Sequence, residues 1–172
     1  MFLQMTDAEN LSHLNLLKMV IYLSAPLFTL AERSWNRSLA DMLRRRGLKV
    51  LLPQEISSAH DHGKHIFQKN VQAIQECDVM VAVLDQADSD SGTSWEVGYA
   101  YGLGKPILGI RTDFRGKADQ LRVNLMNHHA CTAYIEFMDE DMRLLVGKII
   151  TELERLVEIK RREESMAQER SV

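Results

Sequence analysis

Two carboxylates stand where an apolar strand candidate passes into a helix candidate. Asp90 and Glu96 lie six residues apart within residues 90–100, which follow the apolar residues 79–84. In open parallel sheets, ligands gather beyond the carboxyl ends of the strands, and a glycine such as Gly92 lets a small molecule approach the backbone. A carboxylate near a helix N-terminus is held ionised, so Glu96 is suited to act as a nucleophile or to accept hydrogen bonds from hydroxyl groups.

The same residues also allow a purely structural interpretation. Thr93 and Glu96 are spaced as a capping box, in which the glutamate reaches back to a backbone amide at the start of the helix. In that case the carboxylate would stabilise a helix end and carry no chemistry. Trp95, beside Glu96, is expected to be a packing residue that can also wall a pocket.

The elements that must position these carboxylates alternate between strand and helix, which predicts a parallel sheet covered on both faces. Strands are expected at residues 19–23, 50–52, 79–84, 107–110 and 134–137, and helices at 30–46, 64–77, 94–103 and from 139 onward. The predicted fold is α/β, a single doubly wound domain of the flavodoxin-like or Rossmann-like kind with a five-stranded parallel sheet. Residues 1–18 are assigned to an N-terminal extension, 19–159 to the α/β domain and 160–172 to a charged C-terminal tail.

Length and charge limit the partners of the chain. Its 172 residues fit one domain, and 21 basic against 24 acidic residues give no electrostatic footprint for nucleic acid. Cys77 and Cys131 are too few and too dispersed for a disulfide framework or a zinc site, which favours a reducing, intracellular compartment. No signal peptide or membrane-spanning apolar stretch is evident, so we expect a soluble, cytoplasmic protein without a membrane partner.

Histidines gather in two places along the chain. His60, His62 and His65 surround Asp61, and a second group follows residue 127 as His128 and His129. Closely spaced loop histidines without a partner cluster are more often solvated than metal-bound. The sequence therefore predicts neither a metal site nor a cofactor.

Four segments between residues 21 and 127 form an ordered series. They are residues 21–28 (IYLSAPLF), residues 68–78, the D-x-G-x-x-x-E-x-G loop at 90–98, and residues 124–126 (NLM). In this order they resemble the nucleoside 2-deoxyribosyltransferase family. They are similar to its first strand with the loop that closes over the nucleoside, the helix before the next strand, the loop with the glutamate nucleophile, and a segment lent by a neighbouring subunit.

The resemblance implies a role for each matched residue. Glu96 would be the nucleophile at the anomeric carbon, and Asp90 would accept a hydrogen bond from the sugar 5'-hydroxyl. Asn124 would reach the sugar or Glu96 from an adjoining subunit, so a homo-oligomer with a shared active site is implied. The other residues predicted to bind substrate are Tyr22, Phe28, Gln54, Gly92 and Met126.

One position departs from the family pattern. Many members carry an aspartate, the proposed proton donor to the leaving base, where this chain has Asn70. An amide can hydrogen-bond the base but cannot act as its general acid at ordinary pH. Asn70 is kept as a catalytic-site residue, and the general acid stays unassigned.

The sequence predicts a nucleoside 2'-deoxyribosyltransferase that exchanges bases through a covalent intermediate on Glu96, with deoxynucleosides and free purine or pyrimidine bases as partners. Cleavage of the N-glycosidic bond builds oxocarbenium character, which a nearby carboxylate can trap. Two alternatives stay open: a hydrolase of deoxynucleosides or nucleoside 5'-monophosphates, and a binding module without turnover. A phosphate-specific relative would be expected to carry a neutral donor in place of Asp90, and a pure binder would tolerate the loss of Glu96.

Overall fold

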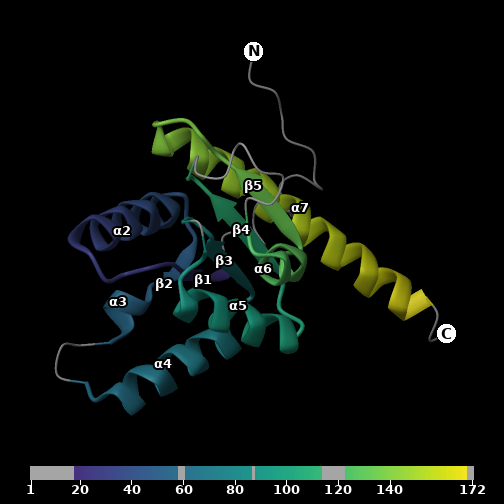
Figure 1. Ribbon diagram of the computed structural model, residues 1–172. Coiled ribbons are helices and arrows are strands. Elements are labelled where there is room, and N and C mark those ends of the chain that lie inside the picture. The colour runs from purple at the N-terminus through teal and green to yellow at the C-terminus, as the bar shows by residue number, and fades with distance from the viewer. Residues whose placement is uncertain (1–17, 58–60, 87, 114–122, 170–172) are drawn as a thin grey trace.

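A five-stranded parallel sheet forms the centre of the protein (Figure 1). The computed structural model describes residues 18–57, 61–86, 88–113 and 123–169. The strands are β1 (Val20–Ser24), β2 (Lys49–Leu51), β3 (Val79–Val83), β4 (Ile107–Arg111) and β5 (Ala133–Glu136), and they lie in the order β2-β1-β3-β4-β5. This confirms the predicted doubly wound α/β fold. The order reverses between β1 and β3, and sheets of this kind open a crevice at such a point, beyond the carboxyl ends of the strands.

Helices cover both faces of the sheet. They are α2 (Leu30–Arg45), α3 (Pro53–Ile56), α4 (Gly63–Glu76), α5 (Ser91–Gly102), α6 (Leu125–Ala130) and α7 (Met142–Glu169). Alternate residues of a strand point to opposite faces, so Ile21 and Leu23 of β1 join the core beneath α2 and α7. Tyr22 joins the second core, beneath α4 and α5. Every residue of β3 is buried, as expected for a central strand covered on both sides.

Two short helices were not predicted from the sequence. Helix α3 begins with Pro53 in the first turn, where a missing backbone N–H costs nothing. Gln54, which follows the strand predicted at residues 50–52, lies within α3. Helix α6 is capped by Asn124, whose side chain accepts the backbone N–H of Met126. Helices of four and six residues are too short to reveal a 3.6-residue period.

The last helix, α7, is the longest of the described helices, with 28 residues. Among the α7 residues whose burial is described, Leu156 is the last in the core, yet the helix continues through Glu169. The charged tail predicted from residue 160 thus begins inside a helix. None of the helices in the described ranges has both the length and the apolar character that crossing a bilayer requires.

Candidate active site

Glu96 joins helix α5 to strand β1 by two hydrogen bonds. The Tyr22 hydroxyl donates to Oε1 at 2.7 Å, and the Ser24 hydroxyl donates to Oε2 at 2.5 Å. Tyr22 and Ser24 are two residues apart on β1, so the pleat turns both side chains toward the face that α5 covers. We call these two groups the hydroxyl pair. They hold both oxygens of one carboxylate at the point where the strand order reverses.

The surroundings of Glu96 control its charge. Burial raises the pKa of its carboxyl group above the ordinary glutamate value, the hydrogen bonds from Ser24 and then Tyr22 lower it, and the charge of Asp90 raises it further. Burial and the Glu96 charge raise the pKa of Tyr22, which is fully buried. The Tyr22 phenol therefore stays protonated and can only donate to the carboxylate. The net result is a glutamate that is more basic than a solvated one.

Asp90 is the residue that caps α5. Its Oδ2 accepts the backbone N–H of Thr93 at 2.8 Å. The capping box predicted from Thr93 and Glu96 is therefore wrong, because the helix begins at Ser91 and Glu96 bonds to β1 instead. A Cβ added at Gly92 would lie 3.1 Å from Asp90 Oδ2, so the glycine leaves room for the capping carboxylate.

Asn70 lies in α4 with its side-chain carbonyl oxygen unsatisfied. This Oδ1 atom is buried and has no hydrogen-bond partner among the described residues. An unmet buried acceptor costs about 1–3 kcal/mol, which a donor from a ligand or from water would remove. Asn70 is therefore able to receive an N–H group.

Phe28 and Gln54 occupy different environments. Phe28 lies between β1 and α2 and is 72% exposed, which leaves its ring free for contact with a ligand. Gln54 Nε2 donates to the backbone oxygen of Arg33 at 2.8 Å, and its Oε1 accepts from Asn36 at 3.4 Å. Gln54 thus ties α3 to α2, and both ends of its amide are in use.

The predicted pair Asn124 and Met126 lies at the surface on α6. Asn124 is exposed and uses Oδ1 to accept the backbone N–H of Met126 at 2.9 Å, and Met126 is 78% exposed. Buried Asn127 fastens this helix to α5 by donating to the Ser94 hydroxyl at 2.9 Å. No hydrogen bond between described side chains joins Asn124 to Glu96 of the same chain.

Two further features were not foreseen from the sequence. In the sequence, Ser24 stands only within the segment 21–28 and has no predicted role, because its contact with Glu96 joins residues far apart in the chain. Trp95 stacks on Tyr99 with ring centroids 5.3 Å apart, and Phe67 of α4 lies 5.3 Å from Trp95. Trp95 is 48% exposed, so these rings form an aromatic row on the outside of α4 and α5.

The segment that contains His60, His62 and His65 forms an ion pair with α4 and does not bring its described side chains together around one point. Asp61 binds Lys69 at 2.7 Å, and His62 and His65 are exposed. His60 lies outside the described residues. Within the residues that are described, no group of three or more His, Cys, Asp or Glu side chains could hold a metal ion.

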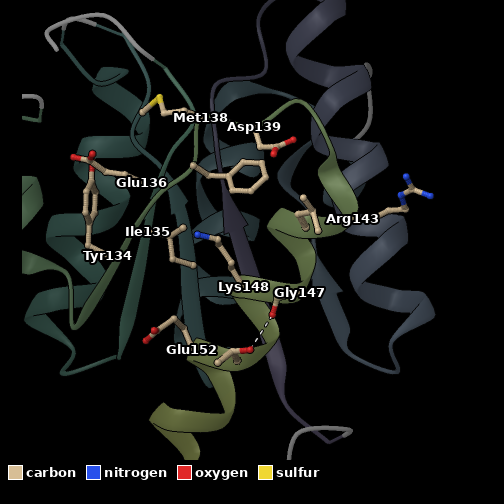
Figure 2. A pocket seen from close by; sticks show the side chains of 12 residues that line it. Tyr134, Ile135, Glu136, Met138, Asp139, Arg143, Gly147, Lys148 and Glu152 are labelled. Carbon is tan, nitrogen blue, oxygen red and sulfur yellow. Dashed lines mark hydrogen bonds between the residues drawn. The ribbon is translucent and has the colours of Figure 1, made fainter.

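A hollow of about 740 Å³ lies elsewhere, between β5 and the start of α7 (Figure 2). Its lining contains none of the predicted site residues. The Glu136 and Arg143 side chains point in different directions, and Lys148 lies 5.9 Å from the centre of the Phe137 ring. Binding sites for small polar ligands need polar groups that converge, so the hydroxyl pair and Glu96 remain the candidate active site.

Comparison with known proteins gives a consistent assignment. Residues 21–126, more than half of the chain, match the family model described as Nucleoside 2-deoxyribosyltransferase. A 2-deoxyribosyltransferase from Leishmania mexicana is 22% identical, with a TM-score of 0.60 over 77% of this chain and 97% of that chain. One from Bacillus psychrosaccharolyticus is 23% identical, with a TM-score of 0.57 over 74% and 90%. A CMP N-glycosidase from Clostridium botulinum is 20% identical, with a TM-score of 0.51 over 76% and 97%. At these identities the three likenesses show a shared fold alone.

Proposed function

Because the chain belongs to the nucleoside 2-deoxyribosyltransferase family, we propose that it moves a 2-deoxyribosyl group from one base to another with Glu96 as the nucleophile. The observation that carries this proposal is the carboxylate held by the hydroxyl pair at 2.7 and 2.5 Å. Such fixed geometry suits a group that must attack one carbon atom from one direction. The raised pKa of Glu96 supports the same role, because a more basic carboxylate is a stronger nucleophile once ionised.

The reaction consists of two displacements at the anomeric carbon. A Glu96 oxygen forms an ester bond to C1' while the N-glycosidic bond breaks, and the departing base keeps the electron pair and takes up a proton. A nitrogen of the second base then attacks C1', loses a proton, and returns the electron pair of the ester bond to Glu96. Two inversions restore the original anomer, and no water is consumed.

Asp90 would select the form of the substrate. Its Oδ2 caps α5, so we assign Oδ1 as the acceptor of a hydrogen bond from the sugar 5'-hydroxyl. A 5'-phosphate at this place would face like-charge repulsion, which grows as the site excludes water. The proposed substrate is therefore a deoxynucleoside rather than its monophosphate.

Asn70 would orient the base. Its buried, unpartnered Oδ1 is suited to accept an N–H group, and a base offers such groups. The amide has no proton to give to a leaving base, so the proton for that step comes from another donor. Phe28, with its exposed ring, would cover the base from the loop after β1.

We further propose a homo-oligomer in which α6 of one protomer completes the site of another. Asn124 and Met126 are exposed, as such a role requires. The outer face of α5 supports an interface, because Trp95 and Tyr101 are 48% and 64% exposed and a Cβ added at Gly98 would meet open space. Apolar helix faces of this kind are typical of contacts between subunits.

Chromatography of a deoxynucleoside incubated with the protein, with and without a second free base, tests the function directly. We expect a new deoxynucleoside only when the second base is present. Free base and deoxyribose in both arms, without an exchange product, would contradict the transferase and favour the hydrolase. Binding of the nucleoside without any product would favour the binding module.

A further inference from the structure

We propose that Ser24 is a positioning residue for the transfer reaction, because its hydroxyl fixes the orientation of the Glu96 carboxylate for attack on the sugar. This inference rests on the proposed function. It concerns a residue that the sequence did not single out and whose hydroxyl donates to the Glu96 carboxylate.

Ser24 is rigidly held. It is fully buried, it is the last residue of β1, and it lies opposite Ala82 in the register with β3. A serine hydroxyl has one side-chain torsion between it and the backbone, so a fixed strand also fixes the place of the oxygen. The 2.5 Å contact with Oε2 therefore anchors the carboxylate to the sheet.

Both members of the hydroxyl pair are needed to stop rotation. The last torsion of a glutamate side chain is broad, so a carboxylate held at one oxygen can still turn about its terminal bond. Tyr22 holds Oε1 and Ser24 holds Oε2, and these two contacts define the carboxylate plane. A defined plane reduces the orientational entropy that the attack must otherwise overcome.

The charge on Glu96 depends on the same contact. Burial disfavours the ionised carboxylate, and the Ser24 hydrogen bond is the first of the two that oppose this effect, with Tyr22 second. The groups that act on Glu96 are Tyr22 and Ser24 from β1 and the carboxylate of Asp90 at the start of α5. In the second displacement Glu96 leaves C1' as a carboxylate, and a hydroxyl donor stabilises the charge as it returns.

The test compares Ser24→Ala with Ser24→Thr, which keeps the hydroxyl, and with Ser38→Ala as a matched control. Ser38 is exposed on α2 and donates to the backbone oxygen of Ser34, away from Glu96. We expect Ser24→Ala to lower kcat by about 10- to 100-fold, as loss of a hydrogen bond to a charged group does, with little change in KM. Ser24→Thr should recover most of kcat, and Ser38→Ala should match the wild type.

A pH profile separates positioning from a structural effect. Without the Ser24 donor the pKa of Glu96 rises, so the acidic limb of kcat/KM should move to higher pH in Ser24→Ala and return in Ser24→Thr. An unshifted limb, or a fall in activity that only follows the loss of folded protein by circular dichroism, would overturn the proposal.

A titration of the Glu96 carboxyl carbon by ¹³C NMR gives a readout that needs no turnover. We expect a higher apparent pKa in Ser24→Ala than in the wild type, and an equal value would count against the role of Ser24. Failure of the proposed function is seen separately, as absence of base exchange by the wild type. In that case the role of Ser24 is judged on hydrolysis and on the same titration.

Discussion

Two regions of the molecule hold predicted site residues: the junction between β1 and α5, and the short helix α6. The side chains in these two regions differ in burial. At the junction, Tyr22 and Ser24 are fully buried and bond to Glu96. On α6, Asn124 and Met126 are exposed, and Asn124 bonds only within its own helix cap among the described contacts. The Glu96 carboxylate is therefore fixed within one chain, whereas the α6 residues are exposed, as the proposed shared site requires.

The largest expected effect comes from removing the carboxylate at the junction. Glu96→Ala should slow base exchange on the order of a thousandfold or more, because it removes the proposed covalent nucleophile. Chromatographic rates measure this, and circular dichroism checks that the fold is kept. Turnover near the wild-type rate would exclude the covalent mechanism and leave Glu96 as a link between α5 and β1.

Subunit mixing tests whether the α6 surface serves a second protomer. Glu96→Ala and Asn124→Ala chains should each be weakly active alone. After exchange of subunits, up to about a quarter of the sites would combine an intact Glu96 with an intact Asn124. Regained activity in the mixture is the expected result. A monomer by light scattering at the assay concentration would contradict the shared site.

The Asp90→Ser variant separates the two roles of Asp90, which are to cap α5 and, as proposed, to select the unphosphorylated substrate. Serine is also a good N-cap residue, so the helix should remain intact. We expect kcat/KM for the deoxynucleoside to fall about 10-fold, while discrimination against the 5'-monophosphate narrows because the repulsive charge is gone. Competition assays with both substrates measure the ratio. If the wild type already prefers the monophosphate, the assignment of Asp90 is wrong.

The smallest effect concerns stability, and it follows from the burial of Glu96. The pKa of Glu96 is raised in the folded state, so its contribution to stability is complete below the ordinary glutamate pKa and is lost as the pH rises through the raised value. Glu96→Gln should therefore unfold on the order of 1–3 °C higher than the wild type at neutral pH, with no gain at acidic pH. Thermal melts at both pH values test this, and an equal gain at both would contradict it.

Most of the fold was predictable because it depends on apolar patterning over long segments. The five strands are short apolar runs between helices, and the structure shifts their predicted ends by only a residue or so. Helix α5 shows where such reasoning fails. Asp90 and Thr93 are both good capping residues, and only the bond from Thr93 N–H to Asp90 identifies the true start. The contact between Ser24 and Glu96 could not be predicted, because it depends on β1 lying beside α5 and joins residues more than seventy positions apart in the sequence.

The attachment of Glu96 to β1 has a consequence for heat inactivation. β1 is an interior strand with β2 on one side and β3 on the other, and interior strands are among the last parts of a protein to open. The strand that supports the proposed nucleophile, Glu96, thus belongs to the most protected part of the molecule. Local fraying at the surface leaves this support in place, so we expect the hydrogen-bonded Glu96 carboxylate to be lost together with the sheet and not before it.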